Sequence, residues 1–188
     1  MSKVSFKAGT LLNPVPVVLV SSKNKEGKIN VFTVAWAGTI CTKPPMLSIS
    51  VRPSRLSYEY IKETLEFVVN IPSVNLTKKV DFCGVKSGSK FDKIKECDFN
   101  MKDSEIVNVP YIDNCPISLE CKVKDIIPLG SHDLFTAEIV NVLYDDNLMD
   151  SKGKLHLEKA NLLCYNHGEY YGIDKKRLGT FGFSVKKK

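Results

Sequence analysis

The sequence predicts a mainly β protein, an antiparallel barrel with short helical insertions. Runs of alternating apolar and polar residues recur along the chain, turn residues separate them, and only a few segments have helical spacing. A chain of 188 residues has the usual size of one domain, and a domain of this size buries on the order of 70% of its unfolded surface. We therefore expect a single domain over residues 1–188.

The first two strands are expected at 14–22 and 29–36, with a turn at Glu26-Gly27 between them. The second strand has two faces, one with Val31, Thr33, Ala35 and Ala37 and the other with Asn30, Phe32, Val34 and Trp36. The small side chains on the first face leave room for something flat to approach the backbone.

Another alternating run follows, in which Leu47, Ile49 and Val51 alternate with Met46, Ser48, Ser50 and Arg52. Lys43-Pro44-Pro45 is predicted to be an extended connection into this strand, because the residue before a proline avoids helical angles. The two runs carry small polar residues and the only tryptophan, where a plain core would be aliphatic. This pattern indicates a strand pair that holds a ligand.

A helix is expected after Arg52-Pro53, with Ser54 or Ser57 as its N-cap and with apolar residues at helical spacing, namely Leu56, Tyr60, Ile61 and Leu65. The start of a helix, with hydroxyls and an arginine beside it, favours the binding of an anion.

The rest of the chain is strand-rich. A helix from a Ser73 cap to about Phe82 and a short helix near 89–95 are expected, with a turn at Gly130-Ser131 between two long strands and a turn at Asn166-His167-Gly168 between the last two. The strands are predicted at 66–71, 115–129, 132–145, 161–165 and 169–172.

Charge and motifs argue against several classes of function. The formal net charge is +6, but the lysines are scattered among acidic residues, so we expect no nucleic-acid partner. A modest positive charge favours anionic small ligands instead. The chain has no GxGxxG after its first strand, no GxxxxGK[ST] loop and no GxSxG. These absences argue against a doubly wound dinucleotide fold, a P-loop nucleotidase and a hydrolase.

Cysteine spacing and hydropathy predict the compartment. No apolar stretch approaches the roughly 20 residues that cross a bilayer, and residues 1–10 lack the apolar core of a signal peptide. We expect a cytoplasmic protein with no membrane partner and no metal site. Six cysteines without a CxxC pair or zinc spacing are expected to be reduced thiols: Cys41, Cys83, Cys97, Cys115, Cys121 and Cys164.

Four segments carry a more specific pattern. The first segment runs from PVPVVLV to VVNIPS, and the other three are DFCGVKSGSKFDKI, LGSHDLFTAEIVNV and YYGIDKKRLGTFGFSV. Together, over roughly residues 10–185, they resemble the flavin reductase-like, FMN-binding split-barrel family, and within it the flavoredoxin branch. The resemblance implies an FMN-binding split β-barrel, FMN as the cofactor and a homodimer with the site near the subunit interface.

The resemblance also implies which residues contact the flavin, and each has an ordinary structural alternative. It places Trp36 beside the isoalloxazine, where the alternative is a core or dimer-interface residue. Asn30 would hydrogen-bond the flavin, or it would only satisfy a turn. Tyr165 would be an aromatic wall of the site, or part of the core. The resemblance also places Cys41 or Cys83 near the flavin, which leaves a redox role open for either, with a plain reduced thiol as the alternative.

We expect Ser57 to bind the FMN phosphate, with support from Arg52. Ser50, on the same predicted strand as Arg52, is also expected to bind FMN. Ser57 is otherwise a helix cap. Lys93 would be the cation near the FMN, with Lys90 as the second choice, because this chain has SGSKFDK where the family usually has an arginine soon after the glycine. Both lysines are otherwise exposed.

His132 is the one candidate for a catalytic role. It follows a Gly-Ser turn, where its ordinary role is to cap loop carbonyls, whereas the resemblance places it at the edge of the flavin ring. An ordinary pKa near 6.5 suits it to hydrogen-bond a reduced flavin or to guide a proton.

The predicted function is that of an FMN-binding flavoprotein that transfers electrons as flavoredoxins do, with NAD(P)H-dependent flavin or ferric reduction as a related activity. Two alternatives stay open. One is an NAD(P)H:flavin oxidoreductase that supplies reduced flavin to a partner oxygenase, and the other is a flavin-binding module without redox function. A redox protein partner or NAD(P)H is expected in the first two cases.

Overall fold

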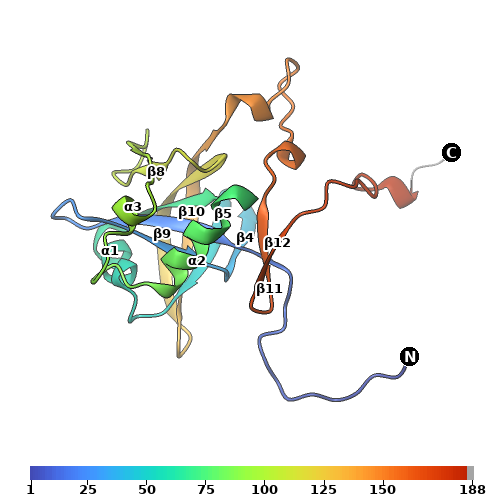
Figure 1. The fold of residues 1–188 in the computed structure, drawn as a ribbon, viewed down its shortest axis with the longest axis horizontal. Coiled ribbons are helices and arrows are strands. Elements are labelled where there is room, and N and C mark those ends of the chain that lie inside the picture. Colours follow the sequence, from blue (N-terminus) through green and yellow to red (C-terminus); the bar gives the residue numbers. More distant parts are fainter. Residues whose placement is uncertain (186–188) are drawn as a thin grey trace.

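The computed structural model describes residues 1–185, and its main feature is one large antiparallel sheet (Figure 1). Seven strands form this sheet in the order β3-β2-β6-β9-β10-β5-β4. Their bounds are β2 Val18–Lys23, β3 Ile29–Val34, β4 Ala37–Thr42, β5 Pro45–Val51, β6 Glu66–Ile71, β9 Ile117–Pro128 and β10 Asp133–Tyr144.

The remaining elements are short. A three-stranded sheet has the order β1-β11-β12, and a two-stranded sheet pairs β7 with β8. These strands are β1 Val15–Pro16, β7 Met101–Lys102, β8 Tyr111–Ile112, β11 Leu163–Asn166 and β12 Glu169–Gly172. The helices are α1 Leu56–Thr64, α2 Thr77–Val85 and α3 Lys93–Glu96, with 3₁₀ turns η1 Val74–Leu76, η2 Asp146–Leu148, η3 Leu157–Lys159 and η4 Phe183–Val185.

The connection from β3 to β4 rolls the large sheet into a barrel. These two strands lie at opposite edges of the sheet, although only Ala35 and Trp36 separate them in the sequence. The edges must therefore approach each other, and β3 contacts β5. The backbone N–H of Ser50 in β5 donates to the carbonyl oxygen of Trp36 at 2.9 Å. The mainly β, antiparallel barrel predicted from the sequence is confirmed.

The two largest apolar clusters of the described residues lie on opposite faces of the sheet. The inner one fills the barrel, and α1 contributes Tyr58 and Ile61 to it. Its other members come from the strands and include Val20, Phe32, Val34, Ile49, Phe67, Phe135 and Ala137. On the outer face, α2 covers β2 and β3, so that Val80 and Cys83 pack against Leu19 and Val31. Because β3 is covered on both faces, the site that it carries has a rigid base.

Several local predictions were wrong. The run at 29–36 ends at Val34, and β4 was not expected at all. Because β4 pairs with β5, Lys43 and Pro44 form a tight hairpin turn rather than an extended connection. Helix α2 begins at Thr77 after a 3₁₀ turn, and Ser73 makes no side-chain cap. The short helix expected near 89–95 is displaced to Lys93–Glu96.

The predicted N-caps of α1 were also wrong. The cap residue is Arg55, without a side-chain cap bond, and Ser54 lies outside the helix. Ser57 is fully buried inside the first turn.

Two arms extend from the barrel (Figure 1). The chain before β1 and the chain after β12 both run away from the sheets and carry exposed apolar side chains. None of the helices within residues 1–185 combines the length and the apolar character that a membrane span requires.

Candidate functional site

Two neighbouring hollows lie along β3. The first, here called the aromatic pocket, has a volume of about 250 Å³ and includes Trp36, Ser50, Arg52, Arg55, His132 and Tyr165 in its lining. The second, here called the lysine pocket, has a volume of about 520 Å³ and includes Asn30, Leu56, Gly88, Ser89, Lys90 and Lys93. The two are neighbours, because Val31 and Leu56 line the lysine pocket, whereas Phe32 and Arg55, the residues next to them in the chain, line the aromatic pocket. Small-molecule sites have volumes of about 300–1,000 Å³.

Trp36 forms one wall of the aromatic pocket. It lies in the two-residue connection between β3 and β4, and this residue, the only tryptophan in the chain, is 46% exposed. Its ring meets the His132 ring edge to face, with centroids 4.8 Å apart and an interplanar angle of 81°. A large apolar ring left open at a cavity gives a flat ligand a surface to stack on.

His132 reaches the pocket from the turn before β10. The Ser131 hydroxyl lies 2.9 Å from its Nδ1 and fixes the ring on that side. Burial, and then the positive charges of Arg52 and Arg55, lower the pKa of His132 below its ordinary value of 6.5. The imidazole is therefore mainly neutral at pH 7 and can donate or accept a hydrogen bond.

Tyr165 closes the pocket from β11. Its ring packs against Tyr170 with centroids 5.7 Å apart. The Tyr170 hydroxyl donates to Asp81 Oδ1 at 3.1 Å, which ties this hairpin to α2. The wall that the hairpin contributes is thus attached to the barrel at a second point.

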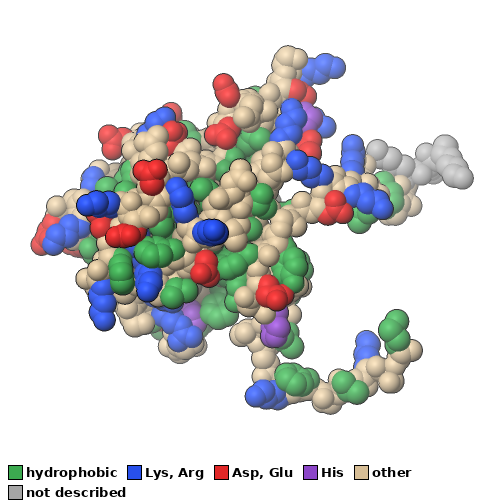
Figure 2. All heavy atoms as spheres, viewed as in Figure 1, with side chains coloured by type: hydrophobic (Ala, Val, Ile, Leu, Met, Phe, Trp, Pro, Cys, Tyr) green, Lys and Arg blue, Asp and Glu red, His purple; other side chains and the backbone are tan. Residues whose placement is uncertain are grey.

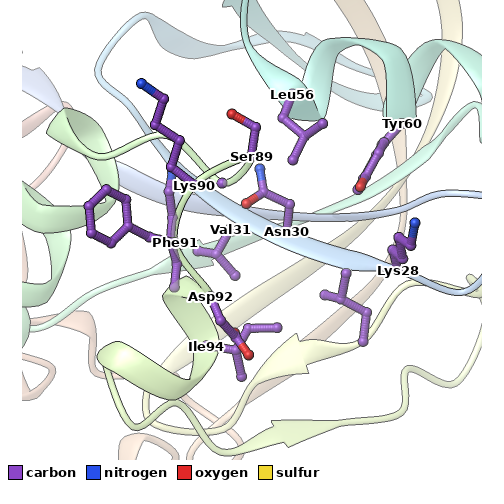
Figure 3. Close-up of a pocket in the computed structure, with 13 residues that line it drawn as sticks. Lys28, Asn30, Val31, Leu56, Tyr60, Ser89, Lys90, Phe91, Asp92 and Ile94 are labelled. Atoms are coloured by element: carbon purple, nitrogen blue, oxygen red, sulfur yellow. The ribbon is translucent and has the colours of Figure 1, made fainter.

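Asn30 lies in the lysine pocket and not in the aromatic pocket (Figure 3). Its Nδ2 donates to Ser57 Oγ at 2.8 Å, and the Ser22 hydroxyl donates to the same oxygen at 2.7 Å. The three side chains are buried, so the amide orientation is fixed. The other end of the amide lies beside Gly88, where an added Cβ would be 2.1 Å from Asn30 Oδ1. The loop that carries Gly88 approaches Asn30 closely because it has no side chain there.

Lys93 is the buried cation of the lysine pocket. Lys93 is only 4% exposed, and its Nζ donates a hydrogen bond to the carbonyl oxygen of Cys83 at 2.8 Å. Burial, and to a smaller extent the charge of Arg55, lower the pKa of Lys93. Among residues 1–185 no carboxylate forms an ion pair with it. A buried cation without a carboxylate partner suits an anionic ligand, which would supply the missing charge.

The positions of Cys83 and Cys41 do not favour a redox role at this site. Cys83 is buried in the outer cluster with its Sγ 3.8 Å from that of Cys97, and burial raises the pKa of Cys83 to about 12. Cys41 is half-buried on β4 and lines neither pocket. All six cysteines are unpaired in the structure.

The structure brings most of the sequence-predicted residues together, but in two groups. The aromatic pocket collects five of them and the lysine pocket collects the asparagine and both lysines. Ser57 lines neither pocket. Its hydroxyl oxygen accepts the hydrogen bond of the Asn30 amide, and its direct contact with a ligand stays a prediction. Arg55 and Gly88 were not predicted. The only signal in the sequence was their position, one before a helix and the other in a glycine-containing loop.

A family model described as "Flavin reductase like domain" matches residues 11–174. An uncharacterized protein of Archaeoglobus fulgidus is 36% identical over 125 residues, which cover 66% of this chain and 71% of that protein.

Two solved structures resemble the whole fold. The flavoredoxin of Desulfovibrio vulgaris (Miyazaki F) is 28% identical, with a TM-score of 0.92 over 98% of this chain and 100% of that one. A flavoredoxin from Methanosarcina acetivorans is also 28% identical, with a TM-score of 0.89 over 99% of this chain and 100% of that one.

Proposed function

This chain belongs to the flavin reductase-like domain family, and from that premise we propose that it is an FMN-binding flavoprotein that transfers electrons as flavoredoxins do. The likeness to two flavoredoxins over nearly the whole chain supports a flavin-related redox role. The observation that carries the proposal is the pair of neighbouring pockets along β3, with aromatic walls in one and, in the other, a buried cation that no carboxylate of residues 1–185 pairs with.

The residues present suit FMN, which combines a flat ring with one phosphate. Trp36 and Tyr165 are suited to cover the ring, and Ser50 offers a hydroxyl beside it. Neutral His132 would hold a proton at a ring nitrogen or oxygen without bringing a charge into the pocket. When bound, FMN supplies the chemistry, since it accepts and releases hydride or single electrons.

The lysine pocket is suited to the phosphate end. Lys93 would supply charge from α3, and Asn30 would offer its amide, which the Ser57 hydroxyl holds in place. Gly88 lets the loop close over this amide without a clash. The protein part of the function is thus to bind the cofactor, shield one face of it and set its potential through these charges and hydrogen bonds.

The first test is the absorbance spectrum of the purified protein, followed by titration of the apoprotein with FMN while Trp36 fluorescence is recorded. We expect flavin bands and quenching, and His132→Ala or Trp36→Ala should weaken FMN binding. A protein without flavin bands that also fails to bind added FMN would rule the proposal out. Anaerobic mixing with NADH or NADPH then tests whether a pyridine nucleotide or a redox protein is the electron donor.

The family's own description favours a second candidate, an NAD(P)H:flavin oxidoreductase that releases reduced flavin to a partner oxygenase. In that case the flavin behaves as a substrate. Loss of FMN during gel filtration, together with rapid NAD(P)H oxidation when free flavin is added, would favour this candidate. Retained FMN and no turnover with free flavin would favour the electron carrier.

A homodimer is part of the proposal, with residues 1–188 as a single domain. Exposed apolar side chains gather on the two arms, which extend from the barrel instead of packing on it (Figure 2). Apolar surface of this kind is typically covered by a partner, and a second copy is the partner that we propose.

A further inference from the structure

Two of the three arginines in the chain lie at the mouth of the aromatic pocket. They are Arg52 and Arg55, the first and last residues of a four-residue turn in which the N–H of Arg55 donates to the carbonyl oxygen of Arg52 at 3.0 Å. Such a turn holds its end Cα atoms within about 7 Å of each other. Pro53 occupies the second position of the turn, where its fixed φ stiffens the backbone.

Both arginines are exposed and line the same pocket. No carboxylate occurs in the lining of that pocket. Every ion pair found among residues 1–185 involves a lysine or a histidine, so neither guanidinium is neutralised by a described acidic side chain. The lowered pKa of His132 has the charges of both arginines among its causes, which indicates that their positive field reaches into the pocket.

The bound cofactor does not require all of this charge. FMN carries one phosphate, and the proposed function seats it in the lysine pocket, where Lys90 and Lys93 are available. Arg52 lies at the opposite end of the groove, next to Trp36 and His132. Arg55 also lines the aromatic pocket and not the lysine pocket, although its charge reaches Lys93. The positive charge at this end is therefore available to a second anion, and two guanidinium groups beside the bound flavin ring suit a flat molecule that carries an oxyanion.

We propose that Arg52 and Arg55 form an oxyanion clamp at the mouth of the aromatic pocket, which selects small, flat redox substrates that carry a carboxylate or a phosphate group. The inference rests on the proposed function, because it takes the FMN ring to lie in the same pocket. Guanidinium groups bind both oxyanions through paired hydrogen bonds. The substrate would be held by its charged group while its flat part faces the cofactor.

The test uses the FMN-loaded protein and three probes: benzoate, phenyl phosphate and the neutral benzamide. Each is titrated while the flavin absorbance spectrum is recorded, so that the readout is binding and not turnover. We expect both anions to bind at least about tenfold more tightly than benzamide, the difference that one charged hydrogen bond confers. The tighter of the two anions identifies the source of the oxyanion, a carboxylic acid or a phosphorylated substrate.

Substitution separates the clamp from general surface charge. Arg52 lines the aromatic pocket and not the lysine pocket, so here it binds the substrate and not, as the sequence predicted, the FMN phosphate. Arg52→Gln and Arg55→Gln should therefore each remove most of the preference for the anions and leave FMN bound. Arg177→Gln is the matched control, because it removes the same charge from the third arginine, on the C-terminal arm. The control should keep the preference. Because both clamp residues are exposed, their replacement is not expected to unfold the protein, which circular dichroism checks.

Three results would overturn the inference. One is equal binding of benzamide and the anions, and another is an unchanged preference in both clamp variants. The third is loss of FMN from Arg52→Gln or Arg55→Gln, because the arginines would then hold the cofactor phosphate. Each of these leaves the flavin-binding proposal standing, whereas wild-type protein that never binds FMN contradicts the proposed function itself.

Discussion

At the scale of single residues, two histidines have opposite electrostatic surroundings. Burial and two arginines lower the pKa of His132, whereas hydrogen bonds from His156 to Asp150 at 3.0 Å and to Glu158 at 2.7 Å raise the pKa of His156. The folded structure stabilises the charged form of His156. His156 therefore stabilises the folded protein below pH 6.5, and this contribution is lost as the pH rises through the pKa of His156 in the folded state. For His132 the sign is reversed, and protonation below pH 6.5 opposes folding.

We therefore predict that the two imidazoles titrate on opposite sides of pH 6.5. The measurement is an NMR titration of the ring protons, with His132→Gln and His156→Gln to assign the signals. Two indistinguishable titration curves would contradict the opposite pKa shifts of the two imidazoles.

Gly88 offers a second test at this scale. A Cβ at this position would lie 2.1 Å from Asn30 Oδ1, so Gly88→Ala must displace the loop or the amide. Overpacking of this kind costs about 1–3 kcal/mol, and we predict an FMN affinity about tenfold lower. Gly38→Ala is the control, because nothing lies within 4 Å of its added Cβ. Isothermal titration of FMN into both variants measures the effect, and equal affinities would remove the Asn30 end from the site.

Residues of the site differ in how far the sequence could predict them. Trp36 and His132 are rare residue types within recognisable segments, and the structure brings them into ring contact. Arg55 looks like any exposed arginine, and its meaning comes only from a turn that places it beside Arg52. Ser57 was expected to cap a helix, but three buried side chains form a network that no local pattern reveals.

At the scale of elements, β4 shows why strand prediction fails at an edge. Its residues, AGTICT, are mostly exposed and show no apolar alternation, so the segment carries no periodic signal. It becomes a strand because β5 offers a partner, from Ala37 opposite Ile49 to Thr42 opposite Pro45. By contrast, the long pair β9 and β10 alternates clearly and was predicted with ends that shift by only a few residues.

The loop between β7 and β8 depends on one buried carboxylate. Glu120 on β9 is fully buried and accepts hydrogen bonds from the backbone N–H groups of Glu105, Ile106 and Val107 and from the amide of Asn141. Burial by itself raises the pKa of Glu120, but these hydrogen bonds outweigh it and the pKa is lowered. Its stabilising effect is therefore present above pH 4.5 and is lost as the pH falls through the folded pKa.

We predict that Glu120→Ala lowers the free energy of unfolding by about 3 kcal/mol, because it leaves buried donors without a partner. Glu138→Ala is the control. It breaks a partly exposed ion pair with Lys124 and should cost no more than about 1 kcal/mol. Urea unfolding followed by circular dichroism compares the two, and similar losses in both variants would contradict the role given to Glu120.

At the scale of the whole molecule, the barrel and the arms differ in how they bury apolar side chains. The barrel closes its own core, whereas the arms expose apolar residues that no described part of the chain covers. These are Val4, Phe6, Leu11 and Leu12 before β1, and Leu178, Phe181, Phe183 and Val185 after β12. The barrel could be predicted from the sequence because apolar and polar residues alternate along its strands. The arms show no such alternation, and only the structure shows that they extend from the barrel (Figure 1).

A second copy that covers these arms would remove their apolar surface from water, which stabilises a complex by about 25 cal/mol for each Å² buried before the costs of association. We predict that the wild type sediments at twice the chain mass of 21.0 kDa. The mass of the double variant Phe181→Ser and Phe183→Ser should shift toward that of the single chain, because this variant removes two large apolar side chains from one arm.

Ile106→Ser is the control, since it removes an exposed apolar residue from the body of the molecule and should leave the mass unchanged. Sedimentation velocity at several concentrations measures all three. A wild type that remains a single chain at every concentration would contradict the dimer, whereas a double variant that remains dimeric would place the interface elsewhere than on the C-terminal arm.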